Sequence, residues 1–168
     1  MIALLLMSAQ AEDREGERIA ADLERLAGDS QWGGVERAYA RLLADHPSAL
    51  AGNLHLVAAQ SARARGDMLL ALQRIQRVTE DDAKHDEAVR ELERLQSATR
   101  LVAIEASVGA VLSADAVPFD PTLKIAIDRA VERVAADGFF VGLLPAGAYK
   151  VGEQAFDLQV GTDWQVVP

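Results

Sequence analysis

The chain has 168 residues, a formal net charge of −9 and no cysteine, and half of its residues are hydrophobic. This length and apolar content suffice for a buried core, so a wholly disordered acidic tail is excluded. The lack of cysteine excludes disulfide frameworks, thiolate zinc sites, cysteine nucleophiles and a lipid-modified N-terminal cysteine. The acidic balance offers no electrostatic footprint for nucleic acid.

The composition changes about halfway along the chain. Residues 12–100 hold 17 acidic and 13 basic side chains and are rich in Ala, Leu and Arg, whereas residues 101–168 hold 9 acidic and 4 basic ones. Six of the eight aromatic residues lie in the second stretch: Phe119, Phe139, Phe140, Tyr149, Phe156 and Trp164. We therefore expect an α+β, two-domain chain, with a helical domain over 12–98 and a small, antiparallel, β-rich domain with one helix over 99–168.

The first eleven residues have features of a secretion signal. Ile2–Met7 is an uninterrupted apolar run, and Ala9 and Ala11 have the small side chains that a signal peptidase accepts. The run is shorter than usual and no Lys or Arg precedes it, as expected if the start codon were assigned too far downstream. Residues 1–11 thus predict a truncated signal peptide and a periplasmic or secreted protein. Alternatively, they form the first turns of helix 1 in a cytoplasmic protein. The run is too short to span a bilayer.

Apolar residues recur at helical spacing in five segments between Glu12 and Gln96, which predicts five helices joined by short loops. Gly28-Asp29-Ser30 is expected to end the first helix and then to cap the second, and Gly66-Asp67 is expected to end the third. Short connections predict that neighbouring helices run antiparallel.

Residues 32–42 superpose on residues 68–78, an offset of 36 residues. The shared positions are Trp32, Val35, Tyr39 and Leu42 in one segment and Met68, Ala71, Ile75 and Val78 in the other, with Gly66-Asp67 before the latter and Pro47 after the former. This pattern resembles the tetratricopeptide repeat, whose period is about 34 residues. The chain departs from the family pattern in Ala58, Ala59 and Ala62, where Leu, Gly and Tyr are usual, and in Ala83, where a second proline is usual.

The resemblance implies antiparallel helical hairpins over residues 13–97 and a concave groove that binds a peptide or a neighbouring domain. Five residues of the third helix that lie off its core stripe are the candidate partner-binding residues: Asn53, His55, Leu56, Gln60 and Arg63. Ordinary solvated surface is the alternative interpretation of each.

In the second half, residues 101–105 and 109–113 are short apolar runs with some β-branched residues, which predict strands. Residues 121–136 fit either alternation or helical spacing, but Asp120 as N-cap, Pro121 at the first position and Gly138 after the end favour a helix. From Phe139 onward the pattern predicts a meander of strands, with a tight turn at Gly152-Glu153 and a last edge strand at 164–167.

The segment Asp137-Gly-Phe-Phe140, followed by Leu144-Pro-Ala-Gly-Ala-Tyr149, resembles carboxypeptidase-regulatory-like and PEGA-like β-sandwich modules over residues 137–160. Such modules are binding or spacer units without a catalytic centre. A second hypothesis is a glycan-binding or cell-surface-binding module that uses Tyr149, Phe156 and Trp164, although small sheets also need such rings in their cores.

The sequence offers little chemistry. Asp81 and His85 are spaced as a metal pair on one helix face, but the sequence supplies no third ligand. No histidine follows His85, so the second half alone cannot hold a Ser-His-Asp system, and no Gly-rich phosphate loop is present. We therefore expect no catalytic residue, no metal and no cofactor, and a non-enzymatic scaffold that binds another protein or peptide. A cytosolic adaptor of the same repeat type is the alternative.

Overall fold

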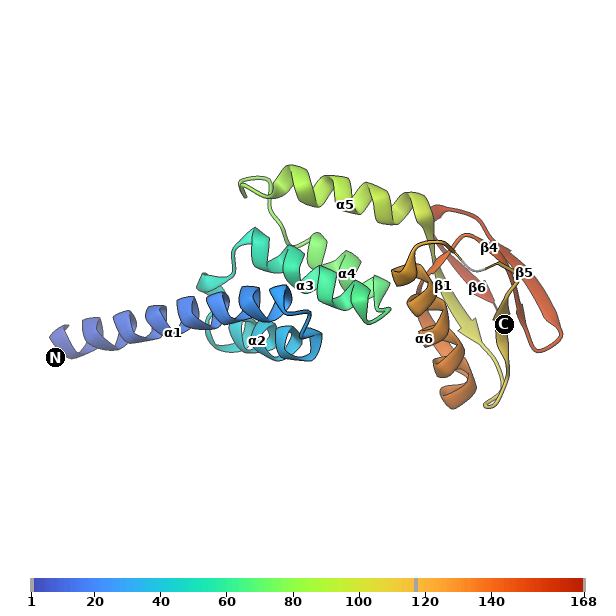
Figure 1. Cartoon of the computed structure of the whole chain (residues 1–168), viewed down its shortest axis with the longest axis horizontal. Coiled ribbons are helices and arrows are strands. Elements are labelled where there is room, and N and C mark those ends of the chain that lie inside the picture. The colour runs from blue at the N-terminus through green and yellow to red at the C-terminus, as the bar shows by residue number, and fades with distance from the viewer. Residues whose placement is uncertain (1, 117, 168) are drawn as a thin grey trace.

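The computed structural model describes residues 2–116 and 118–167, and the side chains of residues 14–116, 118–161 and 163–167. In this part the helices come first and most of the strands second (Figure 1). The helices are α1 (Ile2–Gly28), α2 (Trp32–Asp45), α3 (Gly52–Ala64), α4 (Met68–Ile75), α5 (His85–Ala98) and α6 (Pro121–Asp137), with a 3₁₀ turn η1 (Pro47–Ala49). The prediction of a mixed helix-and-sheet chain is confirmed.

Helix α3 lies between two apolar clusters. On one side Leu54 and Ala58 pack with residues of α1 and α2, among them Tyr39. On the other side Ala59 and Ala62 pack with residues of α4 and α5, among them Ile75. Short alanine side chains let neighbouring helices approach α3 closely on both sides.

The expectation that Gly28-Asp29-Ser30 supplies the cap of α2 is wrong. The N-cap residue is Gln31, and no side chain caps this helix end. Ser30 has a φ of 55°, whereas an N-cap residue needs an extended backbone to turn its hydroxyl toward the first helical N–H groups.

The turn between α3 and α4 fits against the second half of the chain. Gly66 has a φ of 74°, and a Cβ there would lie 2.7 Å from the backbone oxygen of Ile125 in α6. Asp67 follows as the N-cap of α4, and its Oδ1 accepts a hydrogen bond of 3.1 Å from the Leu70 N–H. Its Oδ2 accepts one of 2.9 Å from Arg129 of α6. One turn therefore both starts α4 and binds α6.

The strands form two three-stranded sheets. The first has the order β3 (Phe139–Pro145), β1 (Thr99–Glu105), β6 (Gly161–Val167), with β1 antiparallel to β3 and parallel to β6. The second has the order β2 (Leu112–Ala114), β4 (Gly147–Val151), β5 (Gln154–Leu158), with antiparallel pairs.

Two predictions for the strands need correction. The chain from Phe139 onward is not one meander, because β3 and β4 belong to different sheets and β6 pairs in parallel with β1. Only β4 and β5 form the expected hairpin, around Gly152-Glu153. The strand expected at 109–113 begins at Leu112, because Gly109 has a φ of 87°, outside the extended region.

The expected helix over 121–136 is confirmed as α6. The Asp120 side chain accepts a hydrogen bond of 2.8 Å from the Thr122 N–H, Pro121 occupies the first turn, and Gly138 closes the helix with a φ of 69°. Ile127, Ala130 and Val134 of α6 pack into a cluster that draws on both sheets.

A fourth cluster joins the helical half (residues 14–98) to the sheet half (residues 99–167). Met68 of α4 and Leu95 of α5 pack there with Ala126 of α6 and Leu143 of β3. Helix α5 ends at Ala98 and β1 starts at Thr99, so no linker separates the two halves. Whether residues 12–98 and 99–168 fold as separate domains stays a prediction.

The backbone of α1 is helical from Ile2, but the side chains of residues 1–13 lie outside the described part. The signal peptide expected over 1–11 therefore stays a prediction. Among the described residues, no helix combines the length and the apolar character that a membrane crossing requires.

Candidate functional site

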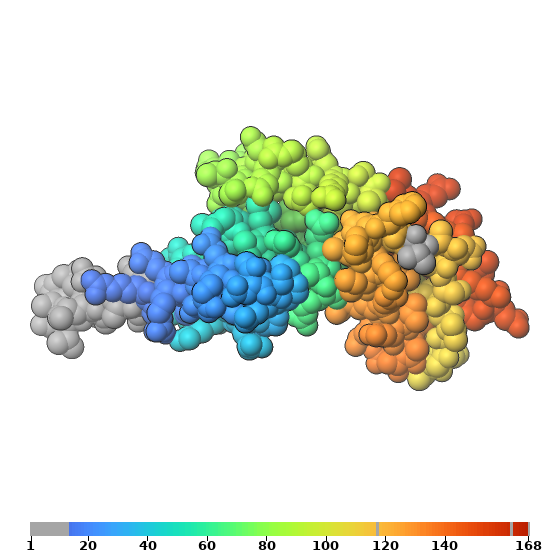
Figure 2. Space-filling model, viewed as in Figure 1, coloured from blue at the N-terminus to red at the C-terminus, as the bar shows by residue number. Residues whose placement is uncertain are grey.

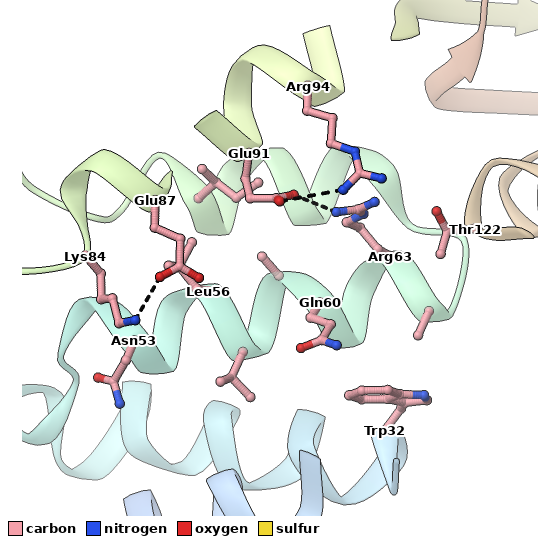
Figure 3. A pocket seen from close by; sticks show the side chains of 14 residues that line it. Trp32, Asn53, Leu56, Gln60, Arg63, Lys84, Glu87, Glu91, Arg94 and Thr122 are labelled. Atoms are coloured by element: carbon pink, nitrogen blue, oxygen red, sulfur yellow. Dashed lines mark hydrogen bonds and ion pairs between the residues drawn. The ribbon is translucent and has the colours of Figure 1, made fainter. Parts of the chain in front are cut away.

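A cavity of about 540 Å³ lies between α3 and α5, the two sides that Figure 2 shows in teal and light green. The base of the cavity is largely apolar, and polar and charged side chains surround its opening (Figure 3). The lining residues are Trp32, Asn53, Leu56, Val57, Ala59, Gln60, Arg63, Ala64, Ile75, Lys84, Glu87, Glu91, Arg94 and Thr122. We call this cavity the α3–α5 groove.

Four of the five predicted partner-binding residues line the α3–α5 groove: Asn53, Leu56, Gln60 and Arg63. Their spacing of three to four residues places them along one face of α3. His55 does not line it, because that side chain points from α3 toward α2, where Nδ1 lies 2.7 Å from the Tyr39 hydroxyl. The groove therefore contains four of the five predicted residues, and His55 lies on another face of α3.

Ion pairs hold the charged rim of the groove. At one end the Lys84 ammonium lies 2.8 Å from Glu87. At the other end Glu91 accepts a hydrogen bond of 2.7 Å from Arg63 and lies 3.8 Å from Arg94. Because the cations and carboxylates are largely paired, the rim is polar without a strong excess of either sign.

Helix α6 closes one end of the groove. The Asp120 carboxylate lies 4.0 Å from Arg63. The hydrogen bond from the Thr122 hydroxyl is the main reason why the pKa of Asp120 is lowered; burial opposes this shift, and Arg63 and Arg94 add to it. Asp120 thus stays ionised beside Arg63, and the sheet half supplies part of the groove wall.

An ion pair between buried Arg74 of α4 and half-buried Glu36 of α2 contacts the backbone of α3. Arg74 donates hydrogen bonds of 2.7 and 2.6 Å to the two carboxylate oxygens of Glu36, and one of 2.6 Å to the Ala58 carbonyl of α3. The Ser61 hydroxyl donates to the same carboxylate over 2.7 Å. Two helices and the backbone of α3 are therefore fixed by one guanidinium group.

The electrostatics of this pair favour its charged form. Burial alone would raise the pKa of Glu36, but the hydrogen bonds from Arg74 and Ser61 and the positive charges of Arg74 and Arg65 outweigh it. The net result is a lowered pKa. Arg74 also lies over the Tyr39 ring, with Cζ 4.7 Å from the ring centroid.

The start of α3 is held by a residue distant in sequence. Asp82 accepts hydrogen bonds of 2.7 Å each from the N–H groups of Gly52 and Lys84, although Ala51 at the N-cap offers no side-chain cap. These backbone hydrogen bonds lower the pKa of Asp82. Asp82 therefore ties the loop before α5 to the first turn of α3, and so links both sides of the groove.

The aromatic residues of the second half do not gather at one surface. Tyr149 is buried and its hydroxyl donates a hydrogen bond of 2.8 Å to the Pro145 carbonyl. Phe156 stacks on Tyr149 with ring centroids 5.7 Å apart. Trp164 lies on β6 of the other sheet and is 53% exposed. Two of the three rings thus belong to the core of the sheet half.

Within the described residues, no group of three or more His, Cys, Asp or Glu side chains is placed to hold a metal ion. The pair Asp81 and His85 belongs to no such group. What the α3–α5 groove does offer is an apolar floor with hydrogen-bonding groups along its rim, an arrangement that suits binding of a peptide segment.

Sequence reasoning missed the residues that α5 and α6 contribute. Lys84, Glu87, Glu91 and Arg94 recur at helical spacing, so their common face was open to prediction from the sequence. Thr122 carried no such signal, because it reaches the groove only through the packing of α6 against the helical half.

Comparison of this chain with protein-family models, with curated proteins and with solved structures finds no match.

Proposed function

We propose that this chain is a non-enzymatic binding protein that docks a segment of a partner protein in the α3–α5 groove. The main support for this proposal is the groove itself, since four of the five residues predicted from the sequence line about 540 Å³ of space. A space of this size accommodates a few side chains of a peptide.

The proposal includes a tetratricopeptide-like arrangement of two helical hairpins, α1–α2 and α3–α4, followed by α5. The offset of 36 residues between α2 and α4 supports it, as does the packing of α1 against α2 and of α3 against α4. In such an arrangement the first helix of a repeat faces the partner, which is the place that α3 has in the groove.

We also propose that the protein acts outside the cytoplasm, in the periplasm or after secretion. The support is the apolar run Ile2–Met7 with Ala9 and Ala11 behind it. N-terminal sequencing of protein from the native cell tests this part separately, since an intact Met1 would contradict it.

Site-specific photo-crosslinking in the native cell tests the groove. Gln60 is exposed and lines the groove, whereas Gln154 is equally an exposed glutamine but lies on β5. A benzophenone side chain at position 60 should join one defined partner, and the same group at position 154 should not join it.

A variant that blocks the groove completes the test. Gln60→Phe fills the groove with a ring, so the partner recovered with wild type should be lost while the melting curve is unchanged. Gln154→Phe is the matched control. Equal recovery of the partner with Gln60→Phe and wild type would contradict the proposed groove.

A further inference from the structure

Strand β3 lies at an edge of the sheet β3–β1–β6, so its backbone pairs with β1 on one side only. In an antiparallel pair, every second residue exchanges hydrogen bonds with the neighbouring strand, and the residues between direct their N–H and carbonyl groups away from it. Just before β3, the Gly138 carbonyl accepts a hydrogen bond of 2.8 Å from the Ala106 N–H. Just after it, the Ala146 N–H donates one of 3.2 Å to the Ala98 carbonyl. Both bonds continue the register of β3 with β1, so the even-numbered residues of β3 bond to β1.

Three residues of β3 therefore direct their N–H and carbonyl groups toward the open edge: Phe139, Val141 and Leu143. Within the described part of the chain, no other backbone group bonds to them on this side. The open stretch ends at Pro145, whose carbonyl accepts the hydrogen bond from the Tyr149 hydroxyl. A row of unpaired backbone groups is suited to an added strand, which supplies the missing hydrogen bonds.

A cavity of about 310 Å³ lies along this open edge. It is lined by residues 139–143 of β3, by residues 66–69 at the start of α4, and by Arg129 and Arg133 of α6. The edge of β3 thus lies between the start of α4 and α6. A single extended chain is narrow enough for this space, whereas a second copy of the protein would bring its own α4 and α6 against these two helices.

The cations beside the open edge indicate what one face of an added strand carries. Helix α6 packs on the core face of the sheet, so its arginines lie on that side of the edge. Arg129 is bound to Asp67 over 2.9 Å, whereas Arg133 is bound over 3.0 Å to Asp137 of its own helix, in a pair whose two side chains are exposed. Exposed pairs contribute little, so a carboxylate of the added strand can replace Asp137. The face toward α6 should therefore carry acidic side chains.

The other face of an added strand meets apolar side chains. Phe139 and Val141 alternate with Phe140, which belongs to the core cluster, so they point away from the core, and both are exposed. Cross-strand neighbours share a face of the sheet, so the residues beside Phe139 and Val141 should be apolar. The expected segment thus alternates between acidic and apolar residues.

We propose that the open edge of β3 binds an extended segment of a partner protein, with alternating acidic and apolar residues, as a fourth strand of the sheet. The row of unpaired N–H and carbonyl groups selects an extended backbone, and Arg133 selects the acidic residues. The cavity at this edge and the α3–α5 groove share no lining residue. The two sites can therefore be occupied independently.

Titration of the full chain with a capped peptide of alternating Val and Glu tests the proposal. The peptide should bind saturably in calorimetry, and amide hydrogen exchange followed by NMR should locate it. On binding, exchange of the Val141 and Leu143 N–H groups should slow, whereas that of Gly142, which already pairs with β1, should not change. A counterpart with Gln in place of Glu should bind about threefold more weakly, as expected for an exposed ion pair.

N-methylated peptides test the strand pairing itself. Only every second N–H of an added strand points toward β3. Methylation of one set of nitrogens, those of Val or those of Glu, should therefore weaken binding at least about tenfold, and methylation of the other set should not. Loss with methylated valines assigns an antiparallel strand, in which bonded residues share a face with Val141, and loss with methylated glutamates assigns a parallel one.

Variants of the chain locate the site. Val141→Pro removes the outward N–H but no bond to β1, so it should keep the melting curve and weaken the Val/Glu peptide at least about tenfold. Val141→Thr keeps the N–H and the shape, and is the matched control. Arg133→Gln should abolish the preference for Glu over Gln, and Arg90→Gln, at an exposed arginine of α5, should retain it. Gln60→Phe should leave the affinity unchanged, so failure here is distinguishable from failure of the α3–α5 groove.

Three outcomes overturn the proposal. If the two sets of methyl groups change the affinity equally, the peptide does not pair as a strand. If exchange slows elsewhere and not at Val141 and Leu143, the peptide binds another surface. If the chain associates with itself and Val141→Pro abolishes that association, the edge belongs to a second copy. Should Val141→Pro alter the melting curve, the exchange and methylation results decide between these outcomes.

Discussion

The helical half and the sheet half hold their interiors together in different ways. The interior of the helical half is divided by α3 into two apolar clusters, and the ion pair of buried Arg74 with half-buried Glu36 lies between the helices. The sheet half has one large cluster that draws on both sheets and α6, with the Tyr149 hydroxyl bonded inside it. We expect the ion pair to specify how these helices pack, and the apolar cluster of the sheet half to supply mainly stability.

The largest expected effect comes from removing one member of the ion pair. Arg74→Met should destabilise the protein by about 3 kcal/mol, the lower end for a broken buried pair, because Glu36 loses its two hydrogen bonds from Arg74 and keeps only Arg65 at 3.9 Å as a cation. Urea denaturation measures the change. The double variant Arg74→Met/Glu36→Met is the control, and it should recover most of the loss because no charge remains unpaired. If both variants lose equally, the pair acts through packing rather than through charge.

A smaller effect should appear as the pH falls. The folded state lowers the pKa of Glu36, so the ion pair contributes stability above the ordinary pKa of glutamate and loses it as the pH drops through the lowered value. Wild type should therefore lose more stability in acid than Arg74→Met/Glu36→Met does. Denaturation curves that follow Trp32 from neutral to strongly acidic pH test this, and parallel losses in the two proteins would refute it.

The smallest effect is expected in the sheet half. Tyr149→Phe removes the hydrogen bond to the Pro145 carbonyl but keeps the stacked ring on Phe156. It should cost about 1 kcal/mol, the net value of one hydrogen bond. Urea denaturation followed at Trp164 measures it, with Tyr149→Leu as a second variant that also removes the ring. If Tyr149→Phe lowered the free energy of unfolding as much as Arg74→Met does, the proposed difference between the two halves would be contradicted.

Much of the local structure could be predicted from the sequence, because local patterns decide it. Asp120, Pro121 and Gly138 fixed the ends of α6, and Gly152-Glu153 predicted the hairpin of β4 and β5. The sheet topology could not be predicted, because the pairing of β6 with β1 depends on contacts between residues distant in sequence. Nothing in the pattern of residues 161–167 distinguishes a parallel from an antiparallel edge strand.

The candidate site, like the fold, could be predicted only in part. The α3 side of the groove was predictable, since Asn53, Leu56, Gln60 and Arg63 lie off the core stripe of one helix. His55 lies two residues after Asn53, so it is on a different face of the helix, where its Nδ1 meets the Tyr39 hydroxyl. The contribution of α6 to the groove depends on how the halves pack, which no local pattern encodes.

The direct continuation of α5 into β1 affects how rigid the α5 side of the groove is before a ligand binds. Thr99, the first residue of the strand, is buried, and its hydroxyl donates a hydrogen bond of 2.7 Å to the Leu95 carbonyl of the helix. Helix α5 thus continues directly into the central strand of a sheet at one end, and Asp82 ties the loop at its other end to α3. A wall anchored at both ends is preorganised, so a docking segment would spend little of its binding free energy on ordering the groove.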